Sequence, residues 1–250
     1  MRLSILFLAA GTLLAQTPET VERSFPFSPA GTPRAIQEMV NAIRGTSGIR
    51  EMQVTADIDT RTLKIQAPPA EAGLAEWVFH LLEDPNSSGE HQYTMPGRWA
   101  DARVFFLVTS ATPRQIQELV NAVRSIAEVQ LLTAFTPRPA LVFRGEPWAV
   151  NTAAWLIHQL DTPPAAQPES AYTISGSYPV DRSPRMAAAV RVFYLSPSAT
   201  PEVMQNLMAR ARREAQVQRI VYMSDAHAIA VRGSDSQAAA TEHIFAEGHP

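Results

Sequence analysis

Residues 32–44 read TPRAIQEMVNAIR, and residues 112–124 read TPRQIQELVNAVR. The two stretches differ at only three of thirteen positions, and a third, weaker copy, TPEVMQNLMARAR, begins at Thr200. Each copy is typical of a helix that begins at its Thr-Pro pair, because threonine caps free N–H groups and proline is tolerated in the first turn. Apolar residues at intervals of three and four give each helix one apolar face. The sequence therefore predicts one structural unit repeated three times.

Runs of apolar residues on both sides of this helix complete the unit. A β-rich run precedes the second and third helices at 104–107 and 192–195, whereas the first copy has Phe25-Pro26-Phe27, whose proline indicates an edge or broken strand. Two runs with one apolar face follow each helix and predict half-buried strands. A second amphipathic helix closes each unit. The predicted fold class is α+β: three tandem β-α-β-β-α units, each a three-stranded mixed sheet with two helices packed on one face.

Two segments rich in Pro, Ser, Gly and Ala separate the units. They contain the similar stretches Tyr93-Thr94-Met95 and Tyr172-Thr173-Ile174, so each segment either is a plain linker or adds an edge strand. The predicted division of the chain is 1–15 (signal peptide), 24–85 (first unit), 86–101 (linker or edge strand), 102–163 (second unit), 164–189 (linker or edge strand) and 190–250 (third unit).

The first fifteen residues predict export. Met1-Arg2 is followed by an apolar run that continues to Ala15, an arrangement typical of a secretory signal peptide, and the run is shorter than the ~20 residues that span a bilayer. We therefore expect the mature chain to be periplasmic or secreted, with no transmembrane segment after signal removal. The chain has no cysteine, which excludes disulfides, thiol nucleophiles and thiolate metal ligands.

The remaining candidates for chemistry do not form a recognisable site. The net charge of −3, from 21 basic and 24 acidic residues, gives no basic field that attracts nucleic acid, so we expect no nucleic-acid partner. Gly45-Thr46-Ser47-Gly48 is similar to the Gly-x-x-Gly loop of KH domains, but it occurs in one copy only and suits a helix end. His80 and His158 recur as Trp-x-x-His and suit the surface of a helix. We predict no catalytic, cofactor-binding or metal-binding residues, and therefore no enzyme activity and no cofactor.

Repeated polar positions on the first helix of each unit are the best candidates for an interface. A glutamine five positions and an arginine twelve positions after the initial threonine recur in all three copies, and they form either a cap or salt bridge within each unit or a repeated docking surface. Trp99 and Trp148 break the repeat pattern; tryptophan is frequent in interface hot spots, although core packing is the preferred interpretation of Trp148. The candidate interface residues are Gln37, Arg44, Gln117, Arg124, Gln205, Arg212, Arg213 and Trp148.

Together these features resemble the short, KH-like, ring-building periplasmic N-terminal domains of the bacterial secretin family, in tandem and without the secretin β-barrel domain. The resemblance covers about residues 24–250, and in that family such domains pack side by side into rings. It therefore implies protein–protein contact, with a second copy of this chain or envelope proteins as partners. The residues that carry the resemblance are the strand and Thr-Pro helix of 104–124, the hairpin end at 142–145, the helix at 148–160, and, in the third copy, 192–195 and 229–233.

Two hypotheses for the function follow from the sequence. The first is a non-enzymatic exported scaffold or assembly protein that acts through contacts of secretin-like domains and belongs to a secretion or pilus envelope complex. The alternative is an extracytoplasmic binding protein for a small molecule or a polysaccharide, which uses the linker aromatics Trp99, Tyr93 and Tyr172.

Overall fold

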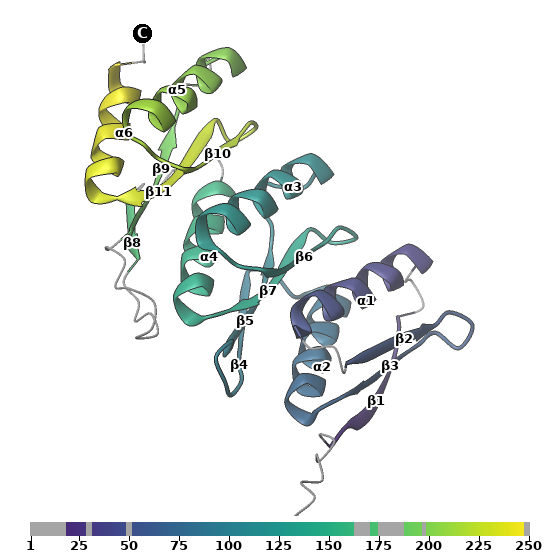
Figure 1. Ribbon diagram of the computed structural model, residues 1–250. Helices are drawn as coiled ribbons and strands as arrows, with labels where there is room; N and C mark the ends of the chain where they lie inside the picture. Colours follow the sequence, from purple (N-terminus) through teal and green to yellow (C-terminus); the bar gives the residue numbers. More distant parts are fainter. Residues whose placement is uncertain are drawn as a thin grey trace, which may run out of the picture.

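The computed structural model describes residues 19–28, 32–48, 52–162, 171–174, 188–196 and 199–247. Its three sheets follow one another along one direction, and each carries its helices on the same side (Figure 1). The predicted signal peptide, residues 1–15, and most of the predicted linker 164–189 lie outside the described residues. Within the described ranges, no helix combines the length and the apolar character needed to cross a membrane.

Each sheet and its two α-helices form one unit, and the units are numbered by their order in the chain. The first unit has the strand order β1-β3-β2 and contains β1 (Val21–Pro26), α1 (Pro33–Ser47), β2 (Gln53–Asp57), β3 (Thr62–Ala67) and α2 (Pro69–Glu83). The second has the order β4-β5-β7-β6 and contains β4 (Glu90–Thr94), β5 (Asp101–Phe106), α3 (Pro113–Ala122), the π-helix η1 (Val123–Ala127), β6 (Leu131–Phe135), β7 (Ala140–Gly145) and α4 (Pro147–Leu160). The third has the order β10-β11-β9-β8 and contains β8 (Ala171–Ile174), β9 (Ala188–Tyr194), α5 (Pro201–Glu214), β10 (Arg219–Met223), β11 (Ala228–Ser234) and α6 (Asp235–Glu247).

The predicted α+β class and the β-α-β-β-α order are confirmed, but the sheets are antiparallel and not mixed. In the first unit, α1 carries the chain across the sheet, and β3 then lies between β1 and β2 and pairs antiparallel with both. The second and third units repeat this arrangement. β4 and β8 lie in the two segments that separate the units, and each adds a fourth, antiparallel strand to the edge of its sheet.

Threonine begins the first helix of each unit, as the sequence predicts. The hydroxyls of Thr32, Thr112 and Thr200 accept hydrogen bonds from N–H groups three residues ahead, at 3.2 Å, 3.3 Å and 3.3 Å. The helix ends differ between units. α1 ends at Gly48, whose φ of +68° is left-handed, whereas α3 continues into the π-helical turn η1, which ends at Glu128 with φ of +61°.

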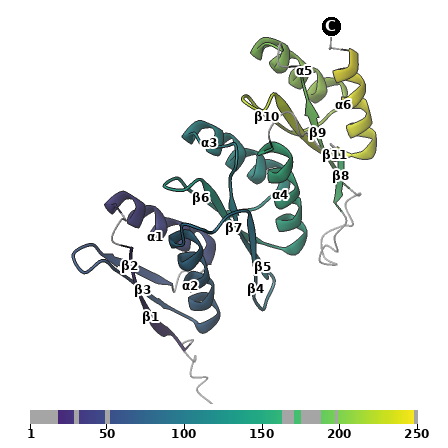
Figure 2. The ribbon, with the colours of Figure 1, turned by 180° about the vertical axis from the view of Figure 1, so that it is seen from behind.

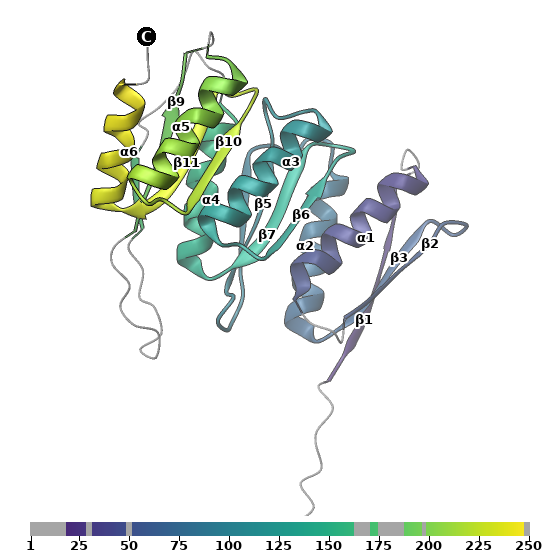
Figure 3. The same ribbon diagram turned by 45° about the horizontal axis from the view of Figure 1, so that its top comes forward.

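The central strands of the second and third sheets bury both of their faces, whereas the apolar patterns predict strands buried on one face only. In β7, Leu141 and Phe143 pack against the helices of their own unit, while Ala140 and Val142 join the core of the first unit. In β11, Ala228 joins the core of the second unit in the same way. The cause is the position of α1 and of α3, each of which packs on the following sheet as well as on its own unit (Figures 2 and 3).

Candidate functional site

A glutamate on the first helix of one unit binds the hairpin turn of the next unit, and this contact occurs twice. Glu38 Oε2 accepts hydrogen bonds from the backbone N–H of Thr136 at 2.9 Å and from its hydroxyl at 2.6 Å. Glu118 accepts the equivalent bonds from Ser224, also at 2.9 Å and 2.6 Å. The two glutamates occupy the same position in the repeat, six residues after the capping threonine. We call the two contact surfaces the first and the second junction.

The charged form of Glu38 maintains the first junction. Burial alone raises the pKa of this carboxyl, but the hydrogen bonds from Thr136 and the ion pair with Arg34 outweigh burial and lower the pKa below its usual value of 4.5. The carboxylate is therefore the form that accepts both hydrogen bonds at neutral pH.

A buried arginine of β7 closes the first junction. Arg144 Nη1 donates to the carbonyl of Ser47 at 2.8 Å and to both carboxylate oxygens of Glu71 at 2.8 Å and 2.9 Å. Its Nε donates to the carbonyl of Trp99 at 2.8 Å. Arg144 and Glu71 are both buried, and only such close pairing compensates the cost of removing two charges from water. This arginine thus ties both helices of the first unit to the second sheet.

The second junction uses an arginine at the same place and a different carboxylate. Arg232 of β11 donates to the carbonyl of Ile126 at 3.0 Å, and it lies 3.3 Å from Glu128 Oε2. Glu128 also pairs with Arg219 of β10 through its other carboxylate oxygen. The guanidinium of Arg232 lies 5.3 Å from the ring centre of Trp148. One carboxylate therefore serves two arginines of the third unit.

A glycine allows α1 to approach the second sheet closely. A Cβ atom at Gly45 would lie only 1.9 Å from Thr133 Oγ1 of β6. The Gly45–Gly48 stretch is thus part of α1 and of its end, which matches its interpretation as a helix end.

Three of the four arginines that were predicted as interface residues recur in every unit, and each bonds within its own unit. Arg44 donates to the carbonyl of Val54, Arg124 to that of Leu132 at 2.9 Å, and Arg212 to that of Ile220 at 3.4 Å. In each case the first helix is tied to the strand that follows it. All three arginines are nevertheless exposed at the surface, and their contact with a partner stays a prediction.

The predicted glutamines lie on the exposed side of the same helices. Gln37 and Gln117 donate to the side chains of Asn41 and Asn121 at 3.1 Å and 3.0 Å, while Gln205 of α5 is exposed. Arg213 pairs with Glu214 on the surface of α5. The three glutamines recur at equivalent places along the stack, so they form a repeated polar surface whose partner stays a prediction.

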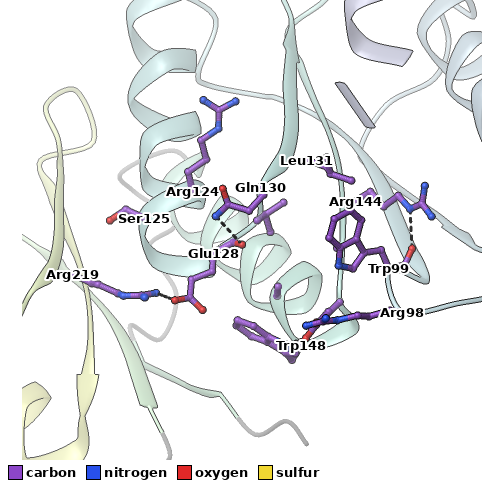
Figure 4. A pocket seen from close by; sticks show the side chains of 14 residues that line it. Arg98, Trp99, Arg124, Ser125, Glu128, Gln130, Leu131, Arg144, Trp148 and Arg219 are labelled. Carbon is purple, nitrogen blue, oxygen red and sulfur yellow. Dashed lines mark hydrogen bonds and ion pairs between the residues drawn. The ribbon is translucent and has the colours of Figure 1, made fainter. Parts of the chain in front are cut away.

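Trp99 and Trp148, the two tryptophans that break the repeat, line one cleft. The cleft has a volume of about 430 Å³ and lies where the loop before β5, the π-helix η1 and the turn from β7 to α4 meet, with Arg219 of the third unit beside it (Figure 4). Trp99 is 38% exposed, and Trp148 is half-buried and donates its Nε1–H to Glu146 at 2.7 Å. Trp148 packs against the buried core of the second unit and also lines the cleft.

The two histidines of the repeated Trp-x-x-His pattern lie at the surface. His80 and His158 are exposed on α2 and α4, where they approach Glu76 at 3.9 Å and Glu90 at 3.1 Å. Among the described residues, no three His, Asp or Glu side chains gather in a group able to hold a metal ion.

Several residues that form the junctions also recur in the sequence, but they are not among the predicted interface residues. Arg144 and Arg232 recur in Arg-Gly pairs at the same distance from the capping threonine. Glu38 and Glu118 also recur, whereas Asn206 stands at their position in the third copy. The glutamate is present in the first and second units, each of which is followed by another unit, and it is replaced in the third. This pattern indicates a contact between consecutive units.

Comparison with known proteins gives solved structures only: no family model and no curated protein matches the chain. ExeD of Aeromonas hydrophila is 16% identical over 92% of this chain and 41% of its own, with a TM-score of 0.23. The N-terminal domain of the secretin XcpQ from Pseudomonas aeruginosa is 20% identical over 57% of this chain and 62% of its own, with a TM-score of 0.25. The type II secretion system secretin GspD of E. coli K12 is 14% identical over 92% and 39%, with a TM-score of 0.20.

The chain resembles secretin N-terminal domains. This is the family that the sequence also resembles, and the chain spans less than two thirds of the length of each of these three structures.

Proposed function

We propose that this protein is a non-enzymatic, exported scaffold or assembly protein that acts through protein–protein contacts of its secretin-like units. It works in the periplasm or outside the cell, as part of a secretion or pilus envelope complex. The proposal includes the signal peptide at 1–15 and the three domains at 24–85, 102–163 and 190–250. Its partners are a second copy of this chain or other envelope proteins.

The observation that carries the proposal is the pair of matching junctions. Glu38 and Glu118 hold the next hairpin, and Arg144 and Arg232 hold the preceding helix ends, so consecutive units meet through the same positions. Apolar residues of each following sheet also join the core of the preceding unit. Units fixed in this way present an extended surface with a regular repeat, as other repeat proteins do when they bind partners.

The exposed positions of the first helices supply the repeated surface. Gln37, Gln117 and Gln205 occupy equivalent places on α1, α3 and α5, which lie on the same side of the stack (Figure 3). The arginines at 44, 124 and 212 lie two helical turns further along. A partner with a matching repeat, such as a second stack, meets three equivalent sites at once, and multivalent contact strengthens weak single contacts.

Two measurements test the proposal. Light scattering of the exported chain, alone and mixed with the envelope proteins encoded beside its gene, should show self-association or a defined complex. A photoreactive amino acid at Gln117 should crosslink to a differently tagged second copy or to one of those proteins, while the same group at Gln92, exposed on β4, serves as the matched control. A chain that stays monomeric at every concentration and forms no complex with those proteins contradicts the proposal.

The alternative function, binding of a small molecule or a polysaccharide, has one observation in its favour. Trp99 lines the cleft of the second unit. The other aromatic residues of that hypothesis do not add to it: Tyr93 packs against Trp77 with ring centres 5.3 Å apart, and the side chain of Tyr172 lies outside what the structure describes. Binding of an oligosaccharide that disappears when Trp99 is replaced supports this alternative.

A further inference from the structure

The cleft of the second unit is lined by two tryptophans, Trp148 and Trp99, that the stacking of the units does not require. Trp148 stands where the first and third units have Ala70 and Ser236, so stacking of the units does not depend on a tryptophan there. Trp99 comes from the loop between β4 and β5. Both side chains nevertheless line the same cleft, within one structure whose other large side chains mostly fill cores (Figure 4).

The charges around the cleft leave a positive surplus. Arg98 pairs with Glu146 at 2.5 Å, and Arg144 pairs with Glu71 behind the cleft wall. Arg219 and Arg232 share the single carboxylate of Glu128. Arg124 forms no ion pair with any described residue and donates only to the carbonyl of Leu132. The residues that line the cleft therefore include four arginines and two glutamates: Arg98, Arg124, Arg144 and Arg219 against Glu128 and Glu146.

The walls of the cleft are held in place before any ligand binds. The ring of Trp99 packs against Gly48, where an added Cβ atom would lie 3.2 Å from the ring and 2.6 Å from Leu131. Trp148 is fixed by its hydrogen bond to Glu146 and by Arg232 near its ring. The π-helix η1 forms part of the wall, and π-helical turns are frequent at functional sites.

We propose that this cleft binds a short acidic peptide segment of a partner protein, with an apolar side chain against the tryptophans and carboxylates at Arg124 and the Arg219–Glu128 pair. Trp and Arg are the residue types that dominate binding energy at protein interfaces. A volume of about 430 Å³ suits one or two side chains of such a segment and lies in the range of ligand pockets. This inference rests on the proposed function, because it names the chemistry of one partner contact of the scaffold.

The test measures peptide binding to the exported chain by isothermal titration calorimetry. The probes are the capped octapeptide GDEFDELG, its neutral counterpart GNQFNQLG, and a tetramer of galacturonic acid. Wild-type protein should bind the acidic peptide at least tenfold more tightly than the neutral one, and a rise in salt should weaken binding because exposed charges are screened.

The first unit supplies a matched control variant. Arg44→Gln and Arg124→Gln remove the same helix-to-strand contact, but only Arg124 lines the cleft. Arg124→Gln and Trp99→Leu should each weaken peptide binding about fivefold to tenfold, as the loss of one charged or aromatic contact does. Arg44→Gln should leave binding unchanged, and circular dichroism checks that each variant folds.

Four results overturn the inference: no binding of the acidic peptide, equal binding of the neutral peptide, equal effects of Arg44→Gln and Arg124→Gln, or tighter binding of the galacturonate tetramer than of the peptide. The last result assigns the cleft to an acidic polysaccharide. A chain that forms its complex but ignores the peptide overturns this inference alone. A chain that binds the peptide through Arg124 but forms no complex overturns the proposed function alone.

Discussion

In each junction a buried arginine pairs with a carboxylate, but the two carboxylates come from different elements of the preceding unit. In the first junction the partner of the central arginine is Glu71, a buried residue of α2. In the second it is Glu128, a partly exposed residue at the end of η1 that also pairs with Arg219. The position of Glu71 is taken by Ala149 in α4, and that of Glu128 is taken by Gly48 in the first unit. The arginine and its carbonyl contact are thus shared, while the source of the compensating charge differs.

Positions that are apolar and buried inside a junction carry polar side chains in the unit where the same face contacts no other described unit. In the second sheet the face toward the first unit carries Ala140 and Val142, whereas Thr62 and Lys64 occupy these places in the first sheet. On the helices, buried Ala42 and Ala122 correspond to Arg210, which pairs with Glu214 and Glu247. A small set of positions therefore decides whether a face stacks on another unit or faces water.

The largest difference between the junctions should follow from removal of the central arginine. Arg144→Met leaves Glu71 buried without its partner, so we expect a loss of about 3–5 kcal/mol in the free energy of unfolding. Arg232→Met leaves Glu128 paired with Arg219 at a partly exposed place, so we expect a loss of about 1–2 kcal/mol. Urea unfolding followed by circular dichroism measures both.

The double variant Arg144→Met with Glu71→Met separates charge from packing. It removes both buried charges, and it should recover most of the stability lost in the single variant, because apolar pairs often replace buried ion pairs without loss. Equal costs for Arg144→Met and Arg232→Met would show that the two carboxylates contribute alike and that burial does not distinguish the junctions.

Much of each unit was readable from the sequence, because its signals are local. The Thr-Pro pair and the apolar spacing of 112–124 predict where α3 begins and which face it buries. The burial of both faces of β7 was missed, although the run Ala140-Leu141-Val142-Phe143 is apolar without interruption, which is typical of strands covered on both sides. The cleft was beyond prediction, since it joins the loop at Trp99, the turn at Trp148 and a strand residue of the next unit, Arg219, which are far apart in the chain.

A second comparison concerns Gly45 and its counterpart Ser125, which already carries a side chain. Gly45→Ala places a Cβ atom 1.9 Å from Thr133 Oγ1, and we expect a loss of about 1–3 kcal/mol despite the better helix propensity of alanine. Ser125→Ala should change stability by less than about 0.5 kcal/mol. In a Thr133→Ala background the loss should shrink, because the oxygen at 1.9 Å is gone and only the Cβ atom of residue 133, at 3.2 Å, remains close. An undiminished loss in that background would show that the oxygen of Thr133 is not the cause.

The hairpin contact of Glu38 should make the first junction sensitive to acid. Its folded-state pKa is lowered, so its contribution is present above pH 4.5 and is lost as the pH falls through the lower, folded-state pKa. Glu38→Gln still accepts both hydrogen bonds but lacks the charge, and we expect a loss of about 1 kcal/mol at neutral pH. Urea unfolding between pH 6 and pH 3 should show a smaller loss of stability in Glu38→Gln than in the wild type. Parallel pH profiles would rule out this role of the carboxylate.

The smallest expected effect concerns the left-handed residues at the helix ends. Glu128 and Gln216 both have positive φ, at +61° and +54°, where glycine is favoured. Gln216→Gly should raise the free energy of unfolding by about 0.5–1 kcal/mol, since it relieves strain and leaves the backbone carbonyl that accepts from Gln237 in place. Glu128→Gly relieves the same strain but removes the ion pairs with Arg219 and Arg232, so it should be close to neutral, while Glu128→Gln should lose about 0.5–1 kcal/mol. If Glu128→Gly gains as much as Gln216→Gly in urea unfolding, the carboxylate of Glu128 contributes nothing to the second junction.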